Sequence, residues 1–121
     1  MREPGWLIRL DDMLECVKLI RQHIRGMTKE TFSANRMAID AVIHNFIILG
    51  EAANRIPDDV RDRIPGIAWQ KIRGMRNRLV HDYFSVDIDV VWQTACGALP
   101  ELERVLQQII ATETRRLSGD A

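Results

Sequence analysis

The stretch IDAVIHNFIILGEAANRI, residues 39–56, decides the fold class of the chain. Its apolar residues recur every three or four positions, which is the repeat of one face of an α-helix. This row consists of Ile39, Val42, Phe46, Leu49, Ala53 and Ile56. A second apolar row, made of Ile43, Ile47 and Gly50, lies on a neighbouring face. Because a helix that is apolar on more than one face is buried on more than one side, we expect an inner helix that also packs on a second subunit.

Helical patterns continue on both sides of this stretch, and strand alternation is absent. The expected helices run from about Trp6 to Ile24, from a cap at Thr31 or Ser33 to about Ile56, from Pro57 to near Pro65, from Ile67 to Val80, and from Val86 or Asp87 to Ala111. Gly26 and Pro57 should end the first two helices, and Gly97 with Pro100 should bend the last. The pattern predicts an all-α fold, an antiparallel bundle of four long helices and one short helix.

The length of 121 residues allows one domain around one hydrophobic core. We expect residues 1–121 to form that domain, with a frayed tail over residues 115–121. No apolar run approaches the ~20 residues that a membrane-spanning helix needs. The first apolar segment contains Asp11 and Asp12, which is not typical of a secretory signal peptide. We therefore expect a cytoplasmic protein without a membrane contact.

The two cysteines, Cys16 and Cys96, lie far apart, and no Cys-x-x-Cys or Cys/His cluster accompanies them. The sequence therefore predicts no metal site and no cofactor. Seventeen basic and seventeen acidic residues give a net charge of zero, whereas a protein that holds nucleic acid through its phosphates usually has a basic excess. Any RNA contact must be local. The segment KIRGMRNR, residues 71–78, has four cations and no acid, and it predicts RNA contacts from Lys71, Arg73 and Arg78.

The overlapping segment RGMRNRLVHDYF, residues 73–84, has the residue types for RNA cleavage without a metal. That reaction needs a base for the 2′-hydroxyl, an acid for the leaving 5′-oxygen and positive charge near the phosphate. His81 can act as base or acid, Arg76 offers a planar fork of donors for phosphate oxygens, and Asn77 can orient the histidine or donate to phosphate. The absence of a carboxylate cluster argues against a two-metal nuclease.

The helical wheel of this segment limits how its residues can meet. Its core side is expected at Ala68, Ile72, Met75 and Leu79. Arg76 and His81 are about 140° apart on a regular helix. They can meet at one phosphate only if the helix ends near His81 or if a second subunit completes the site. Elsewhere, His23 and His44 are interpreted as structural. Glu51 shares a face with His44 and Arg55, which predicts a polar or ion-paired edge, with a contact of Glu51 with the site as the lesser alternative.

The segment RNRLVHDY, residues 76–83, resembles the Arg-x-x-x-x-His-x-Tyr signature of the HepT branch of the HEPN superfamily. Three other stretches resemble the same branch, in the same order: ILGEAANRIP at residues 48–57, PGIAW at residues 65–69, and YFSVD at residues 83–87 with the following Val91 and Trp92. The likeness covers nearly the whole chain. It implies a HEPN-like helical bundle, a homodimer, and metal-independent RNA cleavage with Arg76 and His81 at the dimer cleft.

The resemblance also implies a partner. HepT-like toxins of type VII-like toxin–antitoxin systems are encoded beside an MntA-like minimal nucleotidyltransferase, the antitoxin, which neutralises the toxin. This antitoxin can AMPylate the motif tyrosine, here Tyr83. Without the resemblance, Tyr83 is interpreted as an aromatic residue that closes the core beneath the helix end. The implied RNA substrate is single-stranded or looped, such as tRNA or mRNA.

Three functions remain open on the sequence. The first is an endonuclease that uses Arg76 and His81, with Asn77 assisting. The second is a non-catalytic helical subunit that binds nucleotides or presents substrate to a nucleotidyltransferase, which the neutral net charge favours. The third is a purely structural dimeric bundle. It explains the apolar rows but not the uncompensated cations of residues 71–78.

Overall fold

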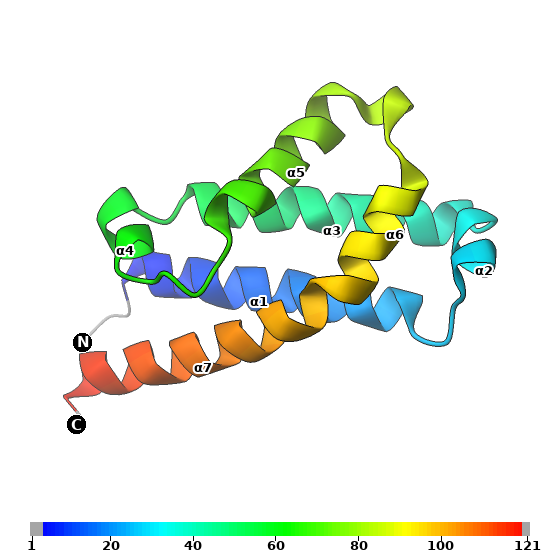
Figure 1. Cartoon of the computed structure of the whole chain (residues 1–121). Helices are drawn as coiled ribbons and strands as arrows, with labels where there is room; N and C mark the ends of the chain where they lie inside the picture. Colours follow the sequence, from blue (N-terminus) through cyan, green and yellow to red (C-terminus); the bar gives the residue numbers. More distant parts are fainter. Residues whose placement is uncertain (1–3, 120–121) are drawn as a thin grey trace.

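The computed structural model describes residues 4–119, and it is helical throughout these residues apart from turns and loops (Figure 1). The elements in chain order are α1 (Gly5–Ile24), α2 (Lys29–Ser33), α3 (Arg36–Asn54), α4 (Asp58–Asp62), α5 (Trp69–His81), the 3₁₀ turn η1 (Tyr83–Ser85), α6 (Ile88–Gly97) and α7 (Leu99–Ser118). The prediction of an all-α fold is confirmed. None of the described helices is both long enough and apolar enough to cross a membrane.

Helix α3 is the inner helix of the bundle. It packs against α1 on one side and α5 on another, and α1 in turn packs against α7 (Figure 1). All six residues of the first apolar row of α3 are buried, as are Ile43 and Gly50 of the second row, while Ile47 is half-buried. The expected inner position is therefore confirmed. Helix α5 packs on α3, and Gly50 of the second row lies directly against Arg76 of α5. The expected contact of this row with a second subunit stays a prediction.

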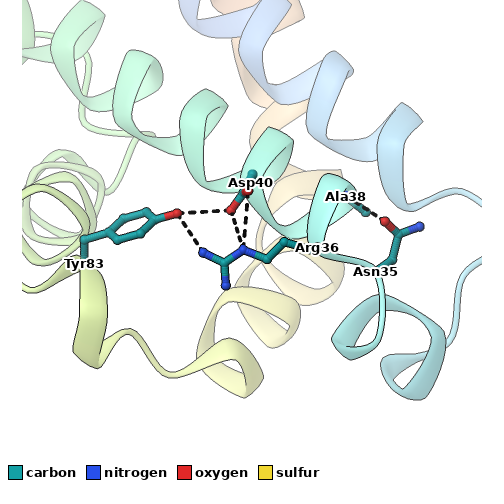
Figure 2. Close-up of polar contacts among 5 residues, drawn as sticks. All are labelled: Asn35, Arg36, Ala38, Asp40 and Tyr83. Atoms are coloured by element: carbon teal, nitrogen blue, oxygen red, sulfur yellow. Dashed lines mark hydrogen bonds and ion pairs between the residues drawn. The ribbon is translucent and has the colours of Figure 1, made fainter.

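The segment before α3 differs from the expected single long helix. Thr28, not Thr31 or Ser33, caps a separate helix α2, and Thr31 completes a capping box by accepting from the Thr28 backbone N–H at 2.9 Å. Phe32 is buried and lies against Trp92, with ring centroids 5.1 Å apart, so α2 is anchored to α6. The chain then turns, and Asn35 caps α3 by accepting from the Ala38 N–H at 3.0 Å (Figure 2). The predicted cap at Thr31 or Ser33 was wrong, because Thr28 caps the short helix α2 and Asn35 then caps α3 as a separate helix.

The start of α5 also differs from the expectation. The helix begins at Trp69 rather than Ile67, and its N-cap Ala68 is exposed instead of facing the core. Ile67 is buried in the preceding loop, and the Trp69 indole N–H donates to the Ile64 carbonyl at 3.1 Å. Because Ile67 is buried as part of the loop and the Trp69 side chain is bonded back to Ile64, the helix begins two residues later than the periodicity predicted.

The C-terminal segment is two helices, where we expected one bent helix that ends near Ala111. The chain breaks at Ala98, and Pro100 lies in the first turn of α7, where its missing N–H leaves no helical bond unmade. Helix α7 then continues to Ser118, and Gly119 ends it at a φ of 82°. The expected frayed tail is therefore wrong up to Ser118, while residues 120–121 of it lie outside the described residues.

An ion-pair cluster explains why α7 stays helical beyond Ala111. Glu113 is buried and accepts hydrogen bonds from Arg63 at 2.7 Å and from Arg116 at 3.2 Å. Burial raises the pKa of Glu113, but the hydrogen bonds from the two arginines outweigh it and hold the pKa below its ordinary value. Arg63 also lies over the Trp6 ring, 5.3 Å from its centroid. These contacts attach the end of α7 to the loop after α4 and to α1.

Candidate active site

The motif of residues 76–83 lies on α5 and on the turn that follows it. Helix α5 ends at His81. An end near this residue was one of the two conditions under which Arg76 and His81 could meet at one phosphate. The Asp82 N–H donates to the Arg78 carbonyl at 2.9 Å and closes the helix. Tyr83 then begins η1. Figure 1 shows that the C-terminal end of α5 and this turn rise away from α3, so the motif lies on a projecting part of the bundle.

Arg76 is the most firmly held side chain of the motif. Its Nε donates to Glu51 Oε1 of α3 at 2.6 Å, and its Nη2 lies 2.5 Å from the same oxygen. Its Nη1 donates to Asn77 Oδ1 at 2.9 Å. The Arg76 side chain is 25% exposed. Arg76 and Asn77 are therefore brought together, and the arginine carries an ion pair to α3 that the sequence did not predict.

A close helix contact lies directly beneath Arg76. A Cβ atom placed on Gly50 would lie 2.2 Å from Arg76 Cβ and 2.7 Å from Arg76 Cγ. Non-bonded carbon atoms do not approach this closely, so only glycine at this position allows α3 and α5 to pack at their present distance. We call Gly50 and Glu51 together the Arg76 seat.

His81 is placed differently. Its side chain is exposed and forms no hydrogen bond or ion pair with Arg76 or with any other of residues 4–119. Its neighbour Val80 is also exposed, at 42%. Within one chain, the predicted pair of Arg76 and His81 shares no side-chain hydrogen bond, and only the arginine is held by polar contacts with its neighbours.

Tyr83 is fixed from the N-terminal end of α3 (Figure 2). Arg36 Nη2 donates to the Tyr83 hydroxyl at 2.9 Å, the hydroxyl donates to Asp40 Oδ1 at 3.1 Å, and Arg36 Nε lies 3.1 Å from the same Asp40 oxygen. Asp40, and after it the Tyr83 hydroxyl, raise the pKa of the Arg36 guanidinium. We call these three residues the Tyr83 clasp. The interpretation of Tyr83 as a core-closing residue is wrong, because the ring is 37% exposed and meets the edge of the fully exposed Phe84.

The three remaining cations of residues 71–78 are Lys71, Arg73 and Arg78. All are exposed, and none forms an ion pair with another of the described residues. Arg76 is the one member of the group whose charge is compensated, by Glu51. The local positive charge that the sequence predicts is therefore present on the surface of α5.

Sequence reasoning missed Arg36 and Asp40, and it gave Gly50 and Glu51 other main roles. Arg36 and Asp40 have the i, i+4 spacing of an ion pair on one helix, but nothing in the spacing indicates Tyr83 as their shared partner. Glu51 does line a groove of about 370 Å³ between α1 and α3 with His44 and Arg55, as their shared face suggested. Its ion pair, however, goes to Arg76. Gly50 was read as part of an apolar row, and its role as a contact point depends on α5.

Among residues 4–119, no group of three or more His, Cys, Asp or Glu side chains is placed to hold a metal ion. Cys16 is buried, and burial, with Asp12 and Glu15 adding, raises the pKa of its thiol to about 11. Cys96 is exposed, and neither cysteine forms a disulfide.

Comparison with known proteins agrees with this architecture. The family described as "Ribonuclease HepT-like" matches residues 13–109. "Putative RNase MJ1216" from Methanocaldococcus jannaschii is 37% identical over 101 residues, which cover 84% of this chain and 84% of that protein. "Probable ribonuclease HepT" from Thermococcus cleftensis is 34% identical over 100 residues, covering 83% of this chain and 91% of that protein. No solved structure shows significant similarity. The family match spans the core of the bundle and the whole motif, and the chain belongs to the HepT-like ribonuclease family.

Proposed function

We propose that this chain is a metal-independent RNA endonuclease whose site contains Arg76, Asn77 and His81. The observation that carries the proposal is the state of Arg76. It is a half-buried arginine oriented by two neighbours, beside a histidine that is exposed at the last residue of the same helix. Relatives named as RNases at 34–37% identity support the same activity.

The chemistry follows from these residue types. His81 takes the proton of the ribose 2′-hydroxyl, and the 2′-oxygen attacks the phosphorus. The bond from phosphorus to the 5′-oxygen then breaks, and a protonated histidine supplies the proton for that leaving oxygen. Arg76 stabilises the charge that develops on the phosphate oxygens. The products are a 2′,3′-cyclic phosphate, or the 3′-phosphate formed from it, and a 5′-hydroxyl. Lys71, Arg73 and Arg78 hold the RNA backbone.

A homodimer completes this site in the proposal. Within one chain, Arg76 forms its hydrogen bonds with Glu51 and Asn77 and none with His81. In the proposal, a symmetric dimer brings one chain's histidine near its partner's arginine. Three exposed apolar side chains belong to the motif or are its neighbours. Val80, at 42% exposure, lies within the motif, and Phe84, at 100%, follows it directly. Met37, at 84%, follows Arg36 of the Tyr83 clasp. In the proposal, these side chains are covered by the second subunit.

Control by a partner enzyme is the second part of the proposal. We assign the chain as the toxin of a type VII-like pair, neutralised by an MntA-like nucleotidyltransferase that AMPylates Tyr83. The exposed position of Tyr83 supports modification of its hydroxyl. An AMP group there removes the proton that the hydroxyl donates to Asp40, and it brings a phosphate beside the Arg36 guanidinium. The bulky nucleoside then lies two residues from His81 and blocks the RNA.

Expression of the chain from a regulated promoter tests the activity. Wild type should arrest growth and degrade RNA, whereas Arg76→Ala and His81→Ala should each lose both effects while they fold as the wild type does. Cleavage by purified wild type should continue in EDTA and leave a 2′,3′-cyclic phosphate or 3′-phosphate end. Loss of cleavage on chelation would contradict the metal-free mechanism.

The second candidate function is a non-catalytic subunit that binds nucleotides. It is favoured by the net charge of zero, because a protein that holds RNA through its phosphates usually has a basic excess. Under this alternative, purified wild type would bind nucleotides but leave RNA intact, and His81→Ala would behave as the wild type does in the growth assay.

A further inference from the structure

The Arg76 seat limits which donors of the arginine remain free. A guanidinium has five N–H groups. One on Nε and one on Nη2 face Glu51, and one on Nη1 faces the Asn77 amide oxygen. One N–H therefore remains on each of the two terminal nitrogens. These two N–H groups remain available to the oxygens of a phosphate group.

We infer that Gly50 and Glu51 are positioning residues for the phosphate-binding arginine, an inference that rests on the proposed nuclease function. Gly50 lets the base of the Arg76 side chain lie directly against α3. Glu51 holds the Nε edge of the guanidinium, so that its end stays turned toward the RNA. Neither residue touches the substrate. Together they fix the side chain in the orientation that the reaction needs.

The charge of Glu51 separates this role from simple RNA binding. A carboxylate beside the phosphate site repels RNA, so its removal should leave ground-state binding equal or tighter. The orientation of the guanidinium matters chiefly when charge develops on the phosphate, and a misplacement of about 1 Å can lower the rate about a hundredfold. Glu51 variants should therefore lower kcat without raising KM. A variant that merely unfolds part of the protein lowers the active fraction, but it does not make RNA binding tighter.

A graded set of variants tests the inference by steady-state cleavage of a labelled single-stranded RNA. Glu51→Ala should lower kcat about a hundredfold, which is the cost of a misplaced group, with KM unchanged or reduced. Glu51→Gln keeps an oxygen acceptor for Arg76 Nε and should recover part of the rate. The matched control is Glu101→Gln, which removes the same charge from an exposed pair with Arg104 on α7. This control should keep the wild-type rate.

A second measurement is independent of activity. In wild type, the Arg76 Nε–H should give a resolved, slowly exchanging signal in ¹⁵N NMR, assigned by its loss in Arg76→Ala. The signal should broaden or vanish in Glu51→Ala and persist in Glu101→Gln. An unchanged Nε–H signal in Glu51→Ala, or an unchanged kcat, overturns the inference. If the wild type cleaves no RNA, the proposed function fails, and the NMR comparison alone decides whether Glu51 positions Arg76.

Discussion

The two ends of the motif are both tied to α3, but by contacts of different strength. At one end, Arg76 and Glu51 are 25% and 38% exposed, and Gly50 lies against the arginine. At the other end, the Arg36 and Asp40 side chains that hold Tyr83 are 68% and 48% exposed. Exposed ion pairs contribute only about 0–1 kcal/mol to stability, whereas a contact between closely packed helices resists displacement. The Arg76 end is therefore the fixed half of the motif, and the Tyr83 end is the adjustable half.

This difference separates the part of the motif that orients the arginine for catalysis from the part that we propose is modified to control the activity. The fixed half holds the group that needs accurate orientation, the phosphate-binding arginine. The adjustable half contains His81 and the tyrosine that we propose as the modification target. A weakly held turn can accommodate a second subunit or an added AMP group at little energetic cost. We expect changes at the Arg76 seat to affect both stability and catalysis, and changes at the Tyr83 clasp to affect control.

The largest effect on stability is expected at Gly50. Gly50→Ala places a methyl group 2.2 Å from Arg76 Cβ, so α5 must move away from α3. Such overpacking should lower the free energy of unfolding by about 1–3 kcal/mol and should lower RNA cleavage at the same time. Urea denaturation followed by circular dichroism measures the first effect, and the labelled RNA assay measures the second.

Gly74→Ala is the matched control on α5. A Cβ atom at Gly74 would meet nothing within 4 Å. Because alanine favours a helix interior, this variant should stabilise the protein by roughly 0.5–1 kcal/mol and keep its cleavage rate. If both alanine variants changed stability by the same amount, the close contact between Gly50 and Arg76 would not exist in solution.

A smaller effect is expected at the clasp. Tyr83→Phe removes the hydroxyl that joins Arg36 and Asp40 but keeps the ring. Its free energy of unfolding should change by less than about 0.5 kcal/mol, as for other surface substitutions, and its RNA cleavage should continue. Coexpressed with the cognate nucleotidyltransferase, wild type should gain one or more AMP masses on the peptide that contains Tyr83, whereas Tyr83→Phe should gain none and stay toxic. Equal silencing of an unmodified wild type would show that complex formation, not AMPylation, controls the toxin.

The sequence predicted those parts of the fold that depend on local periodicity. The apolar row of residues 39–56, the end of the first helix near Gly26 and the end of α5 near His81 were all read from spacing, and the structure agrees with each. The boundaries that depend on particular contacts were missed. The capping box at Thr28 separates α2 from α3, and the ion pairs of Glu113 extend α7.

The candidate site divides in the same way. Arg76, Asn77 and His81 were predicted as site residues from one short segment, and Tyr83 from the resemblance of that segment to the HepT branch. Glu51 was assigned to the edge with His44 and Arg55, because a helical wheel describes one helix at a time. Its pairing with Arg76 joins residues 25 positions apart, and the Asp40 contact with Tyr83 joins residues 43 positions apart. Such pairs follow from how α5 crosses α3, which a single sequence does not specify.

The most direct test of the account is RNA cleavage by mixed dimers of two inactive variants, Arg76→Ala and His81→Ala. We expect each purified variant alone to be inactive. If one site takes Arg76 from one chain and His81 from its partner, a mixed dimer regains one intact site, and the mixture should cleave RNA at a substantial fraction of the wild-type rate. Light scattering should give twice the 14.0 kDa mass of the chain for each species. A mixture that forms dimers but stays inactive would contradict the shared site.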